Sequence, residues 1–449
     1  MRPFFTTPFY QQQRQRRSFI SNHYLYSFYY TQKPTIRTTV TAMPFHTKIL
    51  HVDPSHFHFD EQTSDEFAAQ NAKPVITDPQ DQAAIQEAVD QLSSGEAVGI
   101  PTETVYGLAA NALDANAVSK IFAAKNRPQD NPLIVHVSSL AMLKRILPNN
   151  TIPSIYEPII KKHWPGPLTI ILPTNTAMIP TSITCGQPTV AVRFPSHPVA
   201  RALIDACDFP LAAPSANSSG KPSTTLASHV YDDLNGRIPL ILDGGACNVG
   251  VESTVLDGLR QPPAILRPGG VTYESLQGLK GMEGLQVYRK DFVDRELEQA
   301  PTTPGMKYRH YSPEATVILV DNASDPKAFE QQWQIELAKQ ERPVSRLGLL
   351  VTSSKSIVMN GSPIAAAETV TTKEEENEKH YYHQGVECIP VFMGRSEHPE
   401  EVARGVFKGL RYLDTQNVDL IFVQGIPETE EGMAVMNRLR KAASKVIEL

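Results

Sequence analysis

Residues 97–108 read Ala-Val-Gly-Ile-Pro-Thr-Glu-Thr-Val-Tyr-Gly-Leu, residues 125–128 read Lys-Asn-Arg-Pro, and residues 131–137 read Asn-Pro-Leu-Ile-Val-His-Val. The first run predicts a buried strand from Ala97 to Ile100 that ends at a proline and a polar turn. A short amphipathic helix is expected next, because apolar side chains recur three and four residues apart. The third run predicts a second apolar strand, which carries His136. Strands that alternate with helices in this way favour a mixed α/β fold.

Two cations, Lys125 and Arg127, stand where the predicted helix ends. Arginine offers a planar fork and lysine a point charge, so the pair suits a polyanionic ligand when hydroxyl-bearing loops lie nearby. The alternative is a solvated pair that complements the negative end of the helix dipole. These two residues alone leave both interpretations open.

Seven short segments occur along the chain in a fixed order, and their combination is far more specific than any one of them. They are Pro-Thr-Glu-Thr-Val-Tyr-Gly-Leu (101–108), Lys-x-Arg (125–127), Asn-Pro-Leu (131–133), Trp-Pro-Gly-Pro-Leu-Thr (164–169), Val-Ala-Val-Arg (190–193), Ala-Pro-Ser-Ala-Asn (213–217) and Glu-Ser-Thr-Val (252–255). Together they resemble the YrdC family of threonylcarbamoyl-AMP synthases. The resemblance is dense from residue 78 to residue 271. It continues into a C-terminal domain, as in the long, two-domain, fungal-like form of the enzyme.

The resemblance implies an α/β (α+β) fold whose first domain is a twisted mixed sheet with a concave active site. Beyond residue 315, short apolar runs alternate with helical stretches, which predicts a small, doubly wound, Rossmann-like α/β domain. The predicted organisation is a disordered leader (1–75), a YrdC-like catalytic domain (76–281), a linker and lid (282–315) and a C-terminal α/β domain (316–449).

The activity implied by the resemblance is the synthesis of L-threonylcarbamoyl-AMP from L-threonine, bicarbonate (or CO2) and ATP, with release of pyrophosphate. ATP would be a co-substrate accompanied by Mg2+, and the sequence shows no clustered metal-ligand pattern. The product would pass to a transferase complex that installs threonylcarbamoyladenosine in tRNA. Contact with tRNA or double-stranded RNA stays open.

Site residues carry over from the motifs of the family one by one. The resemblance assigns catalysis to Lys125, Arg127, Ser215 and Asn217, with the cations on the phosphates and the other two on the phosphates or Mg2+. It assigns further ATP contacts to Asn131, Thr189, Ser223, Arg267, His310 and Tyr311. The threonine pocket would comprise Thr104, His136, Arg193, Ala213 (through its backbone) and Ser253, with Arg193 pairing the substrate carboxylate. Tyr308, His310 and Tyr311 belong to a linker motif that resembles a lid over the active site.

Several of these residues have simpler alternatives. From its apolar neighbours, His136 could be a satisfied core histidine rather than a substrate contact. Arg193 could serve a structural ion pair, and Asn217 could complete an Asx-turn. Their joint occurrence favours the functional interpretation over any single spacing.

Composition narrows the competing functions. The net charge is −6, with 41% apolar and 20% charged residues, which is ordinary for a globular protein and provides no global basic field for nucleic acid. A double-stranded-RNA-binding module without catalysis is the main alternative, and it would need a basic stripe with stacking aromatics. A carbamoyl-phosphate-handling domain of the hydrogenase-maturation type normally carries zinc-finger cysteines. The four cysteines here show no C-x-x-C spacing.

The first fifty residues differ from the rest. They contain several arginines and no acidic residue before Asp53, which resembles a mitochondrial transit peptide. The alternatives are a disordered tail or an upstream in-frame extension, with translation also starting at Met43. No apolar run of about 18 residues occurs, so no membrane contact is expected. We therefore expect the protein in the cytoplasm and, if the leader targets it, also in mitochondria.

Overall fold

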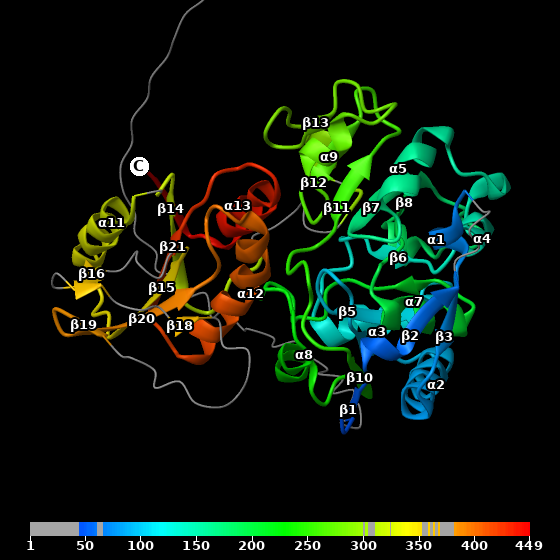
Figure 1. Cartoon of the computed structure of the whole chain (residues 1–449), viewed down its shortest axis with the longest axis horizontal. Coiled ribbons are helices and arrows are strands. Elements are labelled where there is room, and N and C mark those ends of the chain that lie inside the picture. Colours follow the sequence, from blue (N-terminus) through cyan, green and yellow to red (C-terminus); the bar gives the residue numbers. More distant parts are fainter. Residues whose placement is uncertain are drawn as a thin grey trace, which may run out of the picture. The chain divides into compact units, whose positions relative to one another are not determined.

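The computed structural model describes residues 45–60, 66–299, 301–303, 310–323, 325–352, 358–359, 362–363, 367–368 and 381–449. Two sheets organise these residues, a large sheet of 11 strands and a small sheet of 7 strands (Figure 1). The large sheet belongs to the first domain and the small sheet to the second domain. In the part of the chain that the structure describes, every helix is too short or too polar to cross a membrane.

The large sheet is twisted and mixed, as predicted. Across the sheet the strands follow the order β1 (Lys48–His51), β10 (Leu240–Asp243), β4 (Val98–Ile100), β5 (Gly107–Asn111), β9 (Leu211–Ala212), β6 (Ile134–His136), β8 (Thr189–Arg193), β7 (Leu168–Pro173), β11 (Thr254–Asp257), β12 (Ala264–Arg267) and β13 (Gln286–Val287). Parallel pairs such as β6–β8 and β7–β11 neighbour antiparallel pairs such as β7–β8 and β4–β5.

Ten α-helices and three short 3-10 helices accompany this sheet in the described residues. The helices are α1 (Ala68–Asn71), α2 (Pro79–Ser93), α3 (Ala115–Lys125), α4 (Leu140–Arg145), α5 (Glu157–His163), α6 (Thr181–Thr184), α7 (Pro198–Cys207), α8 (Ala227–Leu234), α9 (Tyr273–Gln277) and α10 (Arg295–Gln299), and the 3-10 helices are η1 (Pro54–His56), η2 (Pro148–Asn150) and η3 (Ser154–Tyr156). The main core joins α2, α3, α7 and α8 to one face of the sheet. A smaller apolar cluster lies on the other face, because side chains alternate along a strand: Val135 belongs to the main core and Ile134 to the smaller cluster.

The start of α2 is where the sequence places it. The side chain of Asp78 accepts hydrogen bonds from the backbone N–H groups of Gln80 and Asp81, and Pro79 occupies the first helical position. Gly95, just beyond the end of the helix, has a φ of +81°. An N-cap aspartate, an N1 proline and a glycine after the last turn are all local signals, so the sequence predicts this helix well.

The prediction that residues 1–75 lack structure is wrong for the part of that range that the structure describes. Strand β1 is the edge strand of the large sheet and runs parallel to β10. Strands β2 (Phe57–Asp60) and β3 (Lys73–Ile76) form an antiparallel pair. These strands have four residues each, so they show little periodicity, and the partner of β1 is distant in sequence, with Lys48 paired to Leu240.

Strand β5 was also missed. The predicted sequence of elements passed from the Thr-Glu-Thr turn directly to the helix, whereas residues 107–111 form a strand antiparallel to β4. Its sequence, Gly-Leu-Ala-Ala-Asn, is poor in the β-branched and aromatic residues that mark strands. The strand is buried, and tertiary pairing with β4 and β9 overrides its weak propensity. The turn that carries Thr104 is therefore the loop of a hairpin.

The second domain is doubly wound, as predicted. Its strand order is β18 (Ala367–Glu368), β20 (Val386–Phe392), β15 (Arg346–Val351), β21 (Leu420–Gln424), β14 (Thr316–Asp321) and β22 (Lys445–Glu448), all parallel, with β19 (Tyr381–His383) antiparallel to β20. Strands β16 (Val358–Met359) and β17 (Ser362–Pro363) form a separate pair. Helix α11 (Pro326–Ala338) covers one face of the small sheet, whereas α12 (Pro399–Thr415) and α13 (Glu431–Ala442) cover the other (Figure 1).

Candidate active site

A row of side chains crosses five neighbouring strands on the less covered face of the large sheet. His136 on β6 is paired with Arg193 on β8, which is paired with Thr169 on β7. Thr169 is paired with Val255 on β11, and Val255 with Arg267 on β12. Because directly paired residues point to the same face of a sheet, the register alone brings a histidine, a threonine and two arginines together.

The hairpin turn between β4 and β5 closes one end of this row. Arg193 Nη1 donates a hydrogen bond to Thr104 Oγ1 at 2.7 Å, and Arg193 Nη2 lies 2.8 Å from Glu103 Oε1. Both members of the ion pair are buried, with side-chain exposures of 5% and 7%. Burial raises the pKa of Glu103, but the charge and hydrogen bond of Arg193 outweigh burial and lower it below its usual value. The alternative of a structural ion pair for Arg193 is therefore present in the structure.

Arg193 still has hydrogen-bonding capacity. Its Nε is buried and has no hydrogen-bond partner among the described residues. His136 is in a similar position, because its Nδ1 is buried without a partner within the described part of the chain. Burial, with a contribution from the charge of Arg193, lowers the pKa of His136 to about 3, so the imidazole is neutral at pH 7. His136 is thus not a core histidine whose hydrogen bonds are satisfied.

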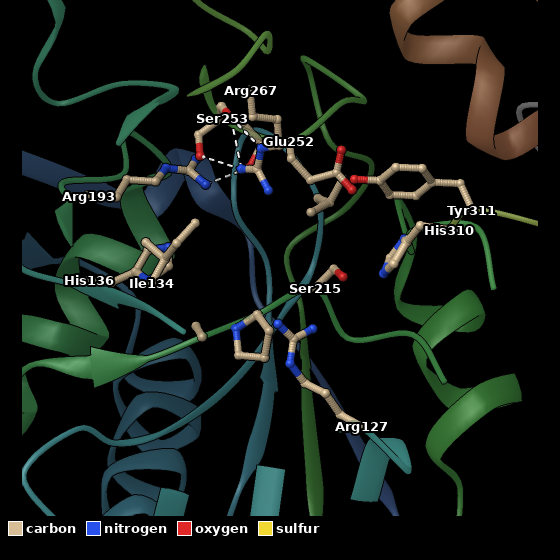
Figure 2. Close-up of a pocket in the computed structure, with 14 residues that line it drawn as sticks. Arg127, Ile134, His136, Arg193, Ser215, Glu252, Ser253, Arg267, His310 and Tyr311 are labelled. Atoms are coloured by element: carbon tan, nitrogen blue, oxygen red, sulfur yellow. Dashed lines mark hydrogen bonds between the residues drawn. The ribbon is translucent and has the colours of Figure 1, made fainter. Parts of the chain in front are cut away.

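Ser253 and Arg267 lie on the same side of the pocket as Arg193 (Figure 2). Arg267 Nη2 donates to the backbone carbonyl of Ser253 at 2.9 Å and to Ser253 Oγ at 3.2 Å. The Ser253 hydroxyl also lies 2.7 Å from Thr169 Oγ1. Burial lowers the pKa of Arg267 to about 10, so the guanidinium is charged at neutral pH despite its buried position. This wall therefore combines a hydroxyl with a fixed cation.

The Ser215 loop, residues 214–223, forms another wall. Lys125 Nζ donates hydrogen bonds to the backbone carbonyls of Ser215 and Asn217, and it lies 3.3 Å from Asn217 Oδ1. Ser215 Oγ donates to Asn217 Oδ1 at 2.5 Å. Lys125 is 1% exposed, and burial followed by the charge of Arg127 lowers its pKa well below the usual value. In this structure the hydrogen bonds of Lys125 hold the loop in place, and Lys125 itself does not line the pocket.

Arg127 faces the pocket from beside this loop. Its Nη2 donates to the backbone carbonyls of Pro132 at 3.1 Å and Asn131 at 3.3 Å. Its Nε is buried with no hydrogen-bond partner among the described residues, and burial lowers the pKa of the guanidinium to about 10. A buried arginine that is still cationic and has a free N–H is well suited to bind an anion.

These walls surround one pocket. Figure 2 shows Arg193, Ser253 and Arg267 on one side, Arg127 and Ser215 on another, and His310 and Tyr311 at a third. The lining residues are Thr104, Val105, Arg127, Ile134, His136, Arg193, Ala213, Pro214, Ser215, Glu252, Ser253, Arg267, His310 and Tyr311. Most of the site residues assigned from the motifs therefore meet at one place.

Five of the assigned residues do not line the pocket. Lys125 and Asn217 support the Ser215 loop, as described above, and Asn131 offers its carbonyl to Arg127. Thr189 opens β8 opposite Pro173. Ser223 is fully buried and donates to Glu252 Oε1 at 2.5 Å. Their roles toward ATP stay predictions.

The linker residues His310 and Tyr311 line one side of the pocket. Tyr311 has a φ of +65°, is 1% exposed and packs against Phe407 of α12, with ring centroids 5.2 Å apart. Burial and the neighbouring Glu252 raise the pKa of Tyr311 to about 12. Burial lowers the pKa of His310 to about 3, and its Nδ1 has no partner among the described residues. Residues 304–309 of the lid motif, Tyr308 included, lie outside the described residues.

Sequence reasoning missed two acidic residues of the site and an arginine that reaches one of them. Glu103 pairs with Arg193, and Glu252 accepts a hydrogen bond from Arg438 Nε of α13 at 2.9 Å. Burial raises the pKa of Glu252, but the charges of Arg438 and Arg267 lower it to about 2. Glu103 lies in the motif at residues 101–108 and Glu252 in the motif at residues 252–255, each next to a residue assigned to the site. That position in the sequence could have identified both acids. Arg438 is 186 residues from Glu252, and no local pattern links them.

Metal binding has little support in the pocket itself. Among the described residues, two clusters of histidine and carboxylate groups could hold an ion, and neither belongs to the pocket lining. They are His56, Asp78 and Asp81, and His398, Glu400 and Glu401. The pocket carboxylate of Glu252 is already committed to Ser223 and Arg438.

Comparisons with known proteins cover both domains. A family model described as "Telomere recombination" matches residues 90–269, and one described as "Threonylcarbamoyl-AMP synthase, C-terminal domain" matches residues 271–444. A threonylcarbamoyl-AMP synthase of Schizosaccharomyces pombe is 44% identical over 425 residues, which cover 90% of this chain and 98% of that protein. One of Pyrococcus abyssi is 42% identical over 361 residues, which cover 80% of this chain and 94% of that protein.

A solved structure extends the similarity to three dimensions. The crystal structure of the Pyrococcus abyssi protein Sua5 complexed with L-threonine matches with a TM-score of 0.67 and 36% sequence identity. The match covers 90% of this chain and 100% of that chain. The similarity therefore extends over both domains, including the strands that carry the candidate site.

Proposed function

The chain belongs to the family of threonylcarbamoyl-AMP synthases, enzymes that use ATP to form an adenylate, and from that premise we propose that it joins L-threonine, bicarbonate or CO2, and ATP into threonylcarbamoyl-AMP with release of pyrophosphate. One observation carries the proposal. Hydroxyl groups and the buried arginines Arg193 and Arg267 on one side of the pocket face Arg127 and the Ser215 loop on another (Figure 2).

The threonine would bind at the wall formed by Thr104, Arg193 and Ser253. The free Nε of Arg193 is a donor for the substrate carboxylate, while its Nη1 and Nη2 are held by Thr104 and Glu103. The neutral imidazole of His136 provides an unpaired nitrogen in the same wall. A small zwitterion needs donors and acceptors at fixed positions, and the register of β6, β8 and β7 fixes them.

The triphosphate would lie along Arg127, Arg267 and the Ser215 loop. Arg127 can neutralise the charge that develops on the leaving pyrophosphate, because its guanidinium is buried, charged and incompletely bonded. Mg2+ would arrive with the nucleotide, and the oxygens of Ser215 and Asn217 are the nearest neutral ligands that this wall offers. Such an ion would shield phosphate charge. Lys125 would hold the loop carbonyls that set this wall.

The chemistry needs positioning more than covalent help. Reaction of the threonine amine with bicarbonate gives a carbamate and water. A carbamate oxygen then forms a bond to the α-phosphorus while the bond to the pyrophosphate oxygen breaks. Preorganised cations and exclusion of water provide most of the catalysis in such a displacement. His310 and Tyr311, which line the pocket, would exclude the water that hydrolyses the mixed anhydride.

The product would serve threonylcarbamoyladenosine formation in tRNA by passing to a separate transferase complex. A mixed carbamic–phosphoric anhydride is activated for attack by an amine, so the consuming reaction must be a carbamoyl transfer to an exocyclic amino group. The test is transfer of the threonylcarbamoyl group from freshly made product to tRNA by the transferase complex.

The synthase activity is tested by pyrophosphate release. We expect release that requires both threonine and bicarbonate, and release that ignores threonine would contradict the proposal. Arg127→Ala is expected to lower turnover by about 10²-fold, the scale for losing one preorganised charge donor. Arg440→Ala is the matched control. It removes an arginine whose ion pairs, with Asp321 and Glu428, lie within the second domain. Wild-type turnover in Arg127→Ala would refute the assignment of this residue.

A further inference from the structure

Arg411 of α12, in the second domain, contacts the Ser215 loop. Its Nε and Nη2 donate to the backbone carbonyl of Pro222 at 3.0 and 2.7 Å, and Nε also donates to the carbonyl of Ser223 at 3.2 Å. These carbonyls close the C-terminal end of the loop. Arg411 therefore binds the backbone of a wall of the pocket without lining the pocket.

The same arginine is also linked to Ser218, in the middle of the loop, through Asp233 of α8. Arg411 Nη2 lies 2.7 Å from Asp233 Oδ2, and that carboxylate oxygen accepts a hydrogen bond from the backbone N–H of Ser218 at 2.9 Å. The Ser218 hydroxyl donates to the Asp233 carbonyl at 3.3 Å. Both charged side chains are buried, with exposures of 9% and 4%. One ion pair thus fixes the loop on both sides of Gly220.

Between these two anchors the loop has a few further contacts: the backbone N–H of Ser219 donates to the carbonyl of Lys125 at 2.9 Å, and Lys221 Nζ lies 3.6 Å from Glu314 Oε1. Asn217 Nδ2 donates to the carbonyls of Ser218 and Lys221, which are within the loop itself. Gly220 has a φ of +91°, and its carbonyl accepts from the backbone N–H of Ser312 at 2.9 Å. Lys125 fixes the preceding segment, Ser215 and Asn217. Among these contacts, Arg411 and Asp233 form the buried, charged anchor that joins Ser218 to Pro222 and Ser223.

We propose that Arg411 is a positioning residue for the nucleotide side of the reaction: through Asp233 and the carbonyls of Pro222 and Ser223, the second domain sets the geometry of the Ser215 loop. The inference deepens the proposed function, because it rests on the loop contacting the ATP phosphates. Among the described residues, Arg411 forms no hydrogen bond or ion pair with the threonine wall, which is built on β6, β8, β7 and the hairpin turn. The two substrates should therefore respond differently to the loss of this arginine.

Steady-state kinetics with separate variation of the two substrates tests the inference. Arg411→Ala is expected to raise KM for ATP by about tenfold to a hundredfold, the scale of a displaced positioning group, while KM for threonine stays within about twofold. Arg411→Lys is the milder variant, and since an ammonium cannot bond two carbonyls and a carboxylate in the same fork, it should show the same selectivity with a smaller change. Asp233→Ala should resemble Arg411→Ala, and the double variant should be no worse than either alone.

A control separates positioning from general loss of stability. Arg440→Ala removes a partly buried ion pair of the same domain that does not contact the loop, and it should leave both KM values unchanged. An equal rise of both KM values in Arg411→Lys, or an equal rise for ATP in Arg440→Ala, would overturn the inference. So would an unchanged KM for ATP in Arg411→Ala.

A readout independent of turnover keeps this inference distinct from the proposed function. Hydrogen exchange should show faster exchange of the Ser218 amide in Arg411→Lys than in the wild type, with the amides of β6 and β8 unchanged. If the wild type released no threonine-dependent pyrophosphate, the proposed function would fail. If it did, and exchange at Ser218 were the same in both proteins, the positioning role of Arg411 would be wrong.

Discussion

A buried neutral histidine makes the stability of this protein depend on pH. The pKa of His136 is lowered to about 3 by burial and by Arg193, whereas an unfolded histidine titrates near 6.5. Between these values the unfolded chain binds a proton that the folded chain does not bind. Stability that is present above pH 6.5 is therefore lost as the pH falls toward 3, at up to about 1.4 kcal/mol per pH unit from this group.

The variant His136→Gln is expected to show a shallower decline of the free energy of unfolding between pH 6.5 and pH 4. Urea denaturation at several pH values measures this slope. His51→Gln, at a side chain that is 83% exposed, provides the control for removing an imidazole as such. Identical slopes in the wild type and in His136→Gln would show that His136 does not remain neutral in the folded protein.

Residue identities in the site were largely predictable, whereas their partners were not. Arg193, Ser253 and Arg127 stand in recognisable motifs, and they line the pocket. Their roles depend on contacts that motifs do not show, such as the pair of Arg193 with Glu103, which is 90 residues away in the sequence. Lys125 is the clearest case. Its charge predicts a phosphate contact, but in the folded chain its three donors are directed to the Ser215 loop.

At the scale of elements, local chemistry decided which helices and strands could be predicted. Helix α2 has its cap, its proline and its periodic face within one short stretch. Strands β1 and β5 have none of these signals. They form because strands distant in sequence pair with them, β10 with β1 and β9 with β5. An element whose stability comes from tertiary pairing cannot be recognised from its own residues.

Strand β1 yields a prediction at this scale. Thr47, just before β1, donates its hydroxyl to the carbonyl of Ile238 at 2.6 Å and accepts from the N–H of Gly236 at 2.9 Å. Thr47→Val keeps the shape but leaves both backbone groups unpaired, so it should lower the free energy of unfolding by about 1–3 kcal/mol. Chemical denaturation measures the loss. Thr47→Ser retains the hydroxyl and should lose less, and equal losses in the two variants would exclude this hydrogen-bonded role.

At the scale of the whole molecule, Gly250 marks a close backbone contact between the two domains. A Cβ atom placed on Gly250 would lie 2.4 Å from Arg404 Cα and 2.5 Å from the carbonyl oxygen of Ala403, both backbone atoms of α12. The φ of Gly250 is +81°. The absence of a side chain therefore permits the contact between α12 and the segment that leads to Glu252 and Ser253.

Gly250→Ala is expected to destabilise the protein in two ways. The positive φ costs about 1–2 kcal/mol in any residue with a Cβ, and the clash with α12 adds about 1–3 kcal/mol. Gly245→Ala is the matched control, because Gly245 has a φ of +85° and nothing within 4 Å of its added Cβ. Thermal unfolding should show the larger loss in Gly250→Ala. Equal losses of thermal stability in the two variants would mean that α12 shifts to accommodate the added methyl group without cost.

The pairing of β1 with β10 also has a consequence for how the chain is made. Thr47 bonds to Ile238, which is 191 residues further along. At a synthesis rate of about 5–20 residues per second, β1 leaves the ribosome roughly 10–40 s before its partner exists. During that interval β1, whose sequence is Lys-Ile-Leu-His, has no sheet to join, and at the other end β22 can pair with β14 only when nearly the last codon has been read. We therefore expect nascent chains of this protein to depend on chaperones while the partner strand of β1 is still being made.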